Sequence, residues 1–205
     1  MRNHILARPC FLHNLAYAIH MRNWYVITGG PSAGKTTLIE ALESNDFHVE
    51  HESARIVIDE GIASGKTIEE IRHDEGVFQD EVYKHKLARE EQLDPEELIF
   101  FDRGMQDTYA YNTLCGAPIT EKMQQEMDGA VYKKVFLLEP FKYEADYART
   151  ESLEERDLLF DLLKEAYTRS KSNIEIVPTF PTKEERIAYF FNYLRDNTGI
   201  RFSNK

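Results

Sequence analysis

The sequence predicts an α/β fold in which a parallel β-sheet lies between two layers of helices, a three-layer sandwich. Most of the expected strands are continuous apolar runs, which are typical of strands that helices cover on both faces. Strand patterns also alternate with helical patterns along the chain, as in a sheet built from βαβ units. The expected strands lie at residues 24–28, 47–50, 98–102, 134–140 and 174–178.

The helices are predicted from their capping and stop residues. Thr67 stands three residues before Glu70 and opens a pattern that predicts one long helix, which ends at Gln92 before Asp94-Pro95. Two further Ser/Thr-x-x-Glu sequences predict the starts of the last two helices. The remaining helices are expected at residues 37–43, 56–62, 105–114, 120–129, 152–171 and 182–197, with a polar, aromatic-rich loop at 141–150.

The chain is expected to hold one domain, at residues 22–197, because no repeat or linker divides it. Residues 1–21 contain no acidic residue and differ in composition from the rest. The tripeptide at residues 21–23 repeats that at residues 1–3, just before the first strand. An acid-poor N-terminus that contains arginines is also typical of a targeting segment, and a simpler alternative is a natural start at Met21. We expect residues 1–21 to be an ancillary extension, disordered or outside the natural protein. Residues 198–205 are expected to form a tail.

The composition excludes several classes of partner. The net charge of −11 argues against binding to nucleic acids or anionic membranes, because their phosphate groups repel an acidic surface. No apolar run approaches the ~20 residues that span a bilayer. Cys10 and Cys115 form neither a disulfide framework nor a metal motif, which favours a reducing compartment. We expect a cytoplasmic protein.

Residues 29–36 match the phosphate-binding pattern G-x-x-x-x-G-K-[ST] at every defined position. An expected strand precedes the run and an expected helix follows it, so backbone N–H groups would surround the phosphates. Lys35 is expected to reach the β- and γ-phosphates of a nucleoside triphosphate, and Thr36 to bind Mg²⁺. The expected nucleotide-binding residues are Gly29, Gly30, Pro31, Ser32, Ala33, Gly34, Lys35, Thr36 and Thr37.

Asp102 ends the third expected strand, after four apolar residues. Functional residues of a parallel sheet gather at the carboxyl ends of its strands, so Asp102 is expected beside the phosphate-binding loop. An acid there holds Mg²⁺ or its water ligands. The alternative is that Asp102 caps the following helix, and one residue can serve both roles.

Several motifs together resemble a known family. Over residues 24–193 the sequence is similar to the small NadR-like P-loop ATPase and kinase domains, an AAA-type ATPase family related to nucleoside and nucleotide kinases. The resemblance rests on residues 28–37, on Glu52-Ser53-Ala54-Arg55, on Phe100-Phe101-Asp102-Arg103-Gly104, on Arg149 and on Glu154-Glu155-Arg156.

The resemblance implies a P-loop NTPase fold with the strand order 2-3-1-4-5, helices on both faces and a lid segment. It implies ATP and Mg²⁺ as ligands, and it places Arg103 near the phosphates or the acceptor. Arg149 and Arg156 would belong to a lid that closes over the triphosphate and neutralises charge in the transition state. The alternative is a solvated face on which Arg156 pairs with a neighbouring acid.

The resemblance also implies an acceptor site. Glu52 follows the second strand, where nucleoside kinases carry a carboxylate that takes the acceptor proton; the alternative is a surface acid beside Arg55. Phe78, Gln79 and Tyr83 would line an acceptor pocket, although Phe78 also fits a place in the core.

We interpret the chain as a small-molecule kinase that transfers the ATP γ-phosphoryl group to a hydroxyl of a nucleoside-like acceptor. Its partners are a nucleoside triphosphate and a small-molecule acceptor. The alternative is an ATPase, a GTPase or a nucleotide-dependent switch that binds a macromolecule, although the guanine-reading N-K-x-D pattern is absent. The sequence does not indicate an oligomeric state. The expected catalytic residues are Lys35, Glu52, Asp102, Arg103, Arg149 and Arg156, with Thr36 and Asp102 as metal ligands.

Overall fold

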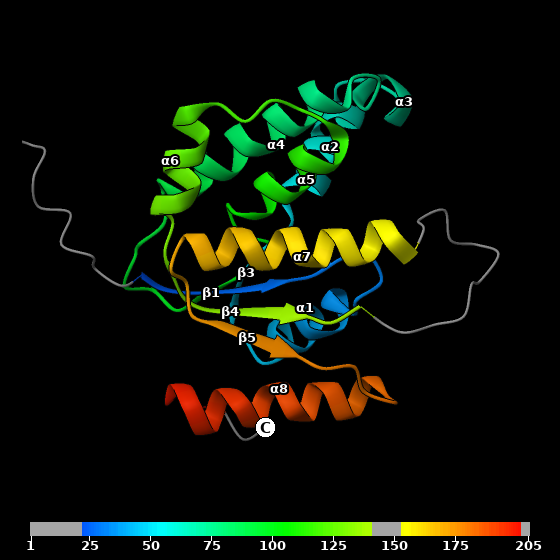
Figure 1. Ribbon diagram of the computed structural model, residues 1–205. Coiled ribbons are helices and arrows are strands. Elements are labelled where there is room, and N and C mark those ends of the chain that lie inside the picture. Colours follow the sequence, from blue (N-terminus) through cyan, green and yellow to red (C-terminus); the bar gives the residue numbers. More distant parts are fainter. Residues whose placement is uncertain (1–21, 141–152, 202–205) are drawn as a thin grey trace, which may run out of the picture.

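A computed structural model describes residues 22–140 and 153–201 and contains a five-stranded parallel sheet (Figure 1). The strand order β2-β3-β1-β4-β5 is the one that the family resemblance implies, and the fold class is confirmed. The expected extension at residues 1–21, the expected loop at residues 141–150 and Arg149 lie outside the described residues. The strands are β1 (Arg22–Thr28), β2 (His48–Glu50), β3 (Ile99–Asp102), β4 (Tyr132–Leu138) and β5 (Ile174–Val177).

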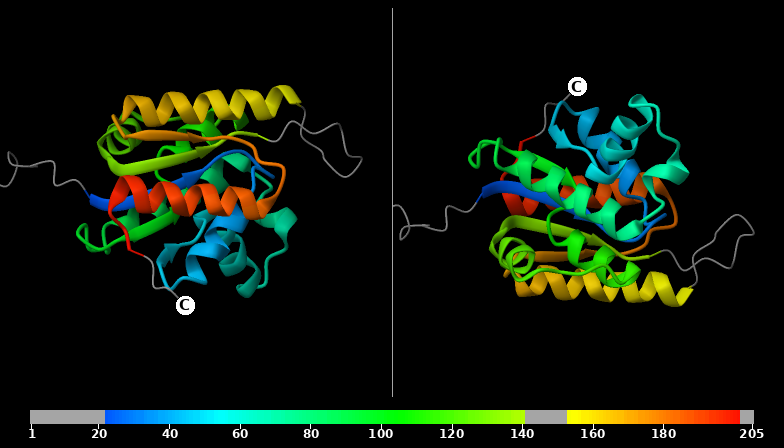
Figure 2. Two further views of the ribbon diagram at one scale, coloured as in Figure 1. Left: turned by 90° about the horizontal axis from the view of Figure 1, so that it is seen from below. Right: turned by 90° about the horizontal axis from the view of Figure 1, so that it is seen from above.

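Helices cover both faces of the sheet, as Figure 1 and the views from below and above in Figure 2 show. Helices α1 and α8 lie on one face, and α4, α5, α6 and α7 lie on the other. The helices are α1 (Lys35–Glu43), α2 (Ser53–Ala63), α3 (Ile68–Ile71), α4 (Glu75–Glu90), α5 (Asp107–Cys115), α6 (Glu121–Gly129), α7 (Leu153–Arg169) and α8 (Lys183–Thr198).

The continuous apolar runs of the strands supply two separate cores, because successive side chains point to opposite faces of a sheet. In β1, Trp24 and Val26 pack beneath α4–α7, whereas Tyr25 and Ile27 pack against α1 and α8. All four of these side chains are buried. The phosphate-binding loop follows directly at the carboxyl end of this central strand.

The single long helix expected from Thr67 to Gln92 is wrong. The structure has two helices, α3 and α4, with a break between Ile71 and Glu75. The Thr67–Glu70 capping box is present, but a second cap follows it, because Asp74 Oδ1 accepts a hydrogen bond from the Val77 N–H at 3.1 Å. An aspartate that caps a new helix ends the preceding one locally.

Smaller differences concern helix starts. Helix α2 begins at Ser53, three residues before the expected start, and α5 begins at Asp107, two residues after it. Helix α8 begins after Thr182, whose hydroxyl accepts from the Glu185 N–H, as the capping sequence predicts. Among the described helices, none is long and apolar enough to cross a lipid bilayer.

Leu194→Ala is expected to lower the free energy of unfolding by about 3 kcal/mol, because a fully buried leucine leaves a cavity when it is truncated. Urea unfolding followed by circular dichroism measures this change. Leu158→Ala is the matched control, since Leu158 is half exposed on α7 and its truncation opens no cavity. Equal losses in the two variants would contradict the assignment of α8 to the core.

Candidate active site

The phosphate-binding loop takes the conformation that its glycines allow. Gly34 has φ +81° and caps α1, and Gly29 has φ +147°. A Cβ atom on Gly29 would lie 2.9 Å from the carbonyl oxygen of Leu138 in β4, so no side chain fits there. The loop therefore packs directly against the neighbouring strand while the first N–H groups of α1 remain at its centre.

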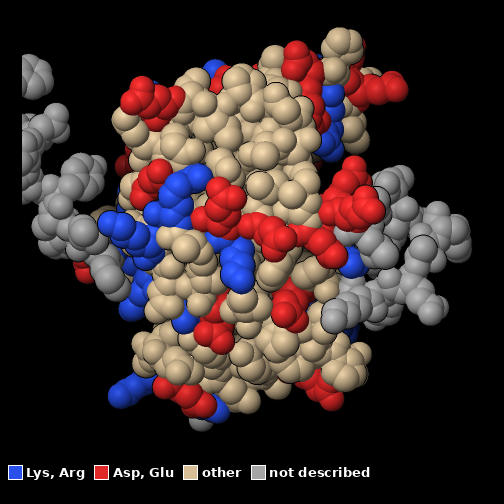
Figure 3. Space-filling view, viewed as in Figure 1, with Lys and Arg blue, Asp and Glu red and all other residues tan. Residues whose placement is uncertain are grey.

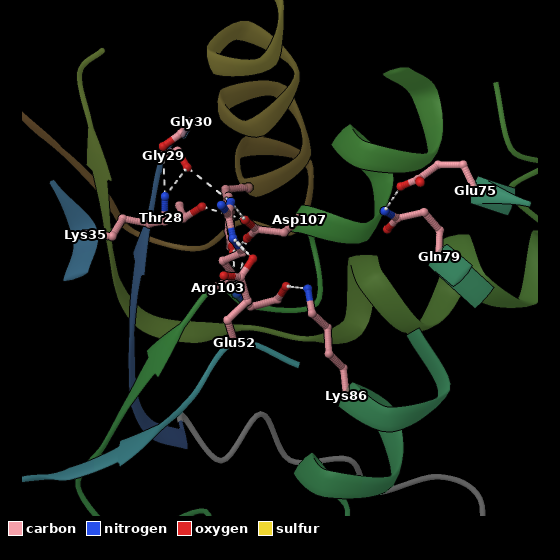
Figure 4. Close-up of polar contacts among 12 residues, drawn as sticks. Thr28, Gly29, Gly30, Lys35, Glu52, Glu75, Gln79, Lys86, Arg103 and Asp107 are labelled. Atoms are coloured by element: carbon pink, nitrogen blue, oxygen red, sulfur yellow. Dashed lines mark hydrogen bonds and ion pairs between the residues drawn. The ribbon is translucent and has the colours of Figure 1, made fainter. Parts of the chain in front are cut away.

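Lys35 lies inside this loop, as Figure 4 shows. Its Nζ donates hydrogen bonds to the carbonyl oxygens of Gly29 at 2.9 Å and Gly30 at 2.8 Å. Burial, reinforced by the positive charge of Arg103, lowers the pKa of Lys35 to about 7. The ammonium group is thus held where the pattern predicts it, in surroundings that favour an incoming anion.

Asp102 lies beside the loop because β3 pairs with β1, with Asp102 opposite Ile27. Its Oδ1 is buried and has no hydrogen-bond partner within residues 22–140 and 153–201. Burial raises the pKa of this carboxyl group. The orphaned carboxylate oxygen of Asp102 and the hydroxyl of Thr36, exposed at the start of α1, are oxygen donors of the kind that suits a hard cation such as Mg²⁺.

Arg103 connects the loop to the rest of the site (Figure 4). It has a left-handed backbone, φ +71°, and its N–H donates to the Ile27 carbonyl oxygen. The guanidinium donates to Gly29 O at 3.1 Å and to Glu52 Oε1 at 2.6 Å. Although burial disfavours its charge, Tyr111 and the surrounding acids hold the pKa of Arg103 above its ordinary value.

Asp107 is a site residue that the sequence analysis does not select. Its side chain is fully buried and lies 3.3 Å from Arg103 Nη1. It accepts hydrogen bonds from Thr28 Oγ1 at 2.7 Å, Gly104 N at 3.2 Å and Tyr167 OH at 2.5 Å. The available signal is that it lies five residues after Asp102, the first residue of the Asp-Arg-Gly segment. Nothing local distinguishes it from a surface acid at the start of a helix.

A cavity of about 440 Å³ lies beside the loop, between α2, α4 and α5. Glu52 and Arg103 line it, together with Pro31 of the loop. Phe78 and Gln79 also line it, as expected, and both side chains are buried.

Tyr83 does not line this cavity, contrary to expectation. It packs in the core beneath α6, and its hydroxyl donates to the Glu126 carboxylate. The reason is helical spacing: Phe78, Gln79, Val82 and Lys86 share one side of α4, and at ~100° per residue Tyr83 falls beyond the edge of that side, toward α6. Lys86 takes the position facing the cavity instead, and its Nζ donates to Gly104 O at 2.8 Å. Lys86 was missed because a lysine in a helix is usually solvated.

Glu52 is not a surface acid paired with Arg55. Its carboxylate instead forms an ion pair with Arg103.

Arg156, on the first turns of α7, lies next to the loop: its Cγ is 3.8 Å from the point that a Cβ of Gly30 would occupy. Its guanidinium also lies 3.4 Å from Asp157 Oδ1, so a neighbouring acid contacts it, as the alternative interpretation holds. Arg156 thus lies beside the loop that is expected to bind the phosphates.

A family described as an AAA domain matches residues 24–186, most of the chain. The chain belongs to this family. The match spans the loop, Asp102, Arg103 and Arg156, and it confirms the family resemblance that the motifs indicate. No curated protein matches the sequence.

Solved structures share the fold of this AAA-domain protein. The NadR protein in complex with NR is 18% identical with a TM-score of 0.60, over 90% of this chain and 54% of that one. Thymidylate kinase from Ehrlichia chaffeensis is 13% identical with a TM-score of 0.56, over 85% and 99% of the two chains. Shikimate kinase from Aquifex aeolicus is 17% identical with a TM-score of 0.52, over 85% and 97%. At these identities the comparison establishes a fold of the P-loop kinase type.

Asp107→Asn is expected to lower the free energy of unfolding by about 3 kcal/mol, because the buried Arg103 charge then loses one of its two carboxylate partners. Urea unfolding at neutral pH measures the loss. Asp80→Asn, on the exposed surface of α4, is the matched control and should leave the midpoint unchanged. A stable Asp107→Asn variant would show that Asp107 does not hold the site together.

Proposed function

We propose that the protein is an ATP-dependent kinase that transfers the γ-phosphoryl group to a hydroxyl of a small, nucleoside-like acceptor. The observation that carries the proposal is the cavity beside the phosphate-binding loop, with Glu52 and Arg103 at the junction between the two. A hydrolase needs only a water molecule at this point, whereas a kinase needs room for a second substrate. The kinase names of several proteins of the same fold support the proposal.

The donor half consists of the loop, Lys35 and the start of α1. In phosphoryl transfer the protein acts mainly by positioning the phosphates and stabilising negative charge. Lys35 and the loop N–H groups would hold the β- and γ-phosphates, with Arg103 and Arg156 close by. Thr36 and Asp102 would hold Mg²⁺, which when bound neutralises phosphate charge.

The acceptor half consists of the cavity and Glu52. One carboxylate oxygen, Oε1, accepts the short hydrogen bond from Arg103, which fixes the group at the cavity wall. Its other oxygen has no hydrogen-bond partner among the residues described, and the side chain is only partly buried. That oxygen would accept the proton of the acceptor hydroxyl. Phe78 offers an aromatic surface and Gln79 an amide for a planar ring.

A screen of nucleosides, sugars and vitamins with ATP and Mg²⁺ tests the proposal. ADP and the phosphorylated product are measured separately. A phosphorylated acceptor formed in step with ADP supports the kinase. ADP with free phosphate alone, whatever the acceptor, would instead indicate a nucleotide hydrolase or switch.

Glu52→Gln is expected to lower phosphoryl transfer by about 100-fold or more, because general-base catalysis is lost, while ATP affinity changes by less than about twofold. Steady-state kinetics and ATP titration measure the two quantities. Glu60→Gln, at an exposed position on α2, the helix that follows Glu52, should change neither. Equal losses of transfer and ATP affinity would remove Glu52 as the base.

ATP affinity is expected to depend on pH through Lys35. Its pKa of about 7 leaves the side chain mostly neutral in the free protein above that pH. A bound triphosphate favours the charged ammonium, so binding takes up a proton. Linkage then predicts that affinity falls by up to about tenfold per pH unit above pH 7 and is less affected by Lys35 below it.

Calorimetric titration of ATP in buffers with different ionisation enthalpies measures this proton uptake directly. Lys35→Arg keeps its charge over the whole range, so any binding by this variant should occur without uptake at this position. Wild-type binding above pH 7 with no proton uptake would contradict the electrostatic account of Lys35.

A further inference from the structure

The cavity wall is rich in positive charge although the chain as a whole is acidic, with a net charge of −11. On the face seen in Figure 3, Asp and Glu side chains gather over α7. The wall of the cavity instead carries four cations, Arg55, Arg72, Lys86 and Arg103, and two acids, Glu52 and Asp107. A third acid, Glu75, does not line the cavity but forms an ion pair with Arg72 at 2.8 Å. Four cations therefore stand against three acids.

The acids of this group are already engaged. Glu52 accepts from Arg103, and Asp107 accepts from three neutral donors besides its contact with Arg103. Arg55 differs, because it makes no ion pair and no side-chain hydrogen bond with any residue in 22–140 or 153–201. Its side chain lines the cavity and is exposed to solvent, so it is available to a ligand.

Lys86 is a buried cation with spare donors. The residue is only 7% exposed, and its Nζ donates one hydrogen bond, to Gly104 O. An ammonium group has three donors, and no described residue accepts the other two. Burial lowers the pKa of Lys86, with Asp107 opposing this change and Arg103 reinforcing it. A ligand anion in the cavity would supply the missing acceptors and stabilise the charge.

The first turn of α2 lies at the same wall. Ala54 and Arg55, both in that turn, line the cavity, and no side chain caps the N-terminus of this helix. The N–H groups of an uncapped first turn favour negative charge. Lys86, Arg55 and these N–H groups therefore come from two elements, α2 and α4, that pack together around one space.

From this arrangement we infer that the acceptor is itself an anion: it carries a phosphate or carboxylate group that Lys86, Arg55 and the first turn of α2 bind. This inference rests on the proposed kinase function and narrows its acceptor from nucleoside-like molecules in general to anionic ones. Phe78 and the amide oxygen of Gln79, on the same cavity wall, would contact the neutral ring of that acceptor, while Gln79 Nε2 donates to Glu75 Oε1 at 3.1 Å.

Matched ligand triads test the inference by binding alone. Adenosine, guanosine, cytidine and uridine are each titrated beside their 5′-monophosphates and 5′-carboxylates. The full-length protein is used with Mg²⁺ and a saturating non-hydrolysable ATP analogue, so that the donor loop is occupied. At least one monophosphate or carboxylate should bind about tenfold or more tightly than its parent nucleoside, and the better of the two anions identifies the group. If no anion binds more tightly than its nucleoside, the inference is wrong.

Variants locate the anion site. Arg55→Gln should remove most of the preference for the anion and leave nucleoside affinity unchanged, and as an exposed substitution it should not disturb folding. Lys86→Met should act in the same direction, with Lys84→Met, at an exposed position of the same helix, as its matched control. A preference that survives in both Arg55→Gln and Lys86→Met would overturn the assignment. The phosphorylated product, measured in the same mixtures with ATP in place of the analogue, distinguishes the two proposals. Anion binding without a phosphorylated product supports the anion site and contradicts the kinase.

Discussion

The buried carboxylate of Asp107 is the group on which the rest of the site depends. It accepts hydrogen bonds from Thr28 at the end of β1, from Gly104 after β3 and from Tyr167 on α7, and it lies against Arg103. A carboxylate without access to water is tolerated only when such donors surround it. Two strands and a helix that are distant in the sequence are therefore fixed relative to one another by one charge.

Arg103 extends this constraint to both halves of the site. Its guanidinium contacts the carbonyl oxygen of Gly29 in the phosphate-binding loop and the carboxylate of Glu52 at the cavity. The charge of Arg103 also contributes to the low pKa of Lys35, so the loop contains a cation that gains stability when phosphate arrives. The phosphate-binding loop and the cavity are thus linked through one side chain rather than assembled independently.

Local patterns account for much of the fold and for the donor site. The strands were predicted because apolar runs need helices on both faces, and the loop because its glycines and Lys35 must stand at fixed spacing. The sequence does not predict the break between α3 and α4, because the apolar pattern continues across it and the cap at Asp74 is a single side-chain hydrogen bond. The positions of Tyr83 and Lys86 are not predicted from the sequence, because the periodicity of a helix does not show which of its faces lines a cavity.

The sequence by itself determined that strands and helices alternate, that a phosphate-binding loop follows the first strand, and that Asp102 ends the third. These features depend on residues close together in the chain. Only the tertiary structure decided which charges meet: Asp107 with Arg103, Arg103 with Glu52, and Lys86 with the cavity wall. The physical reason is that burial and pairing of charges depend on how α2, α4 and α5 pack against the sheet, which no local pattern specifies.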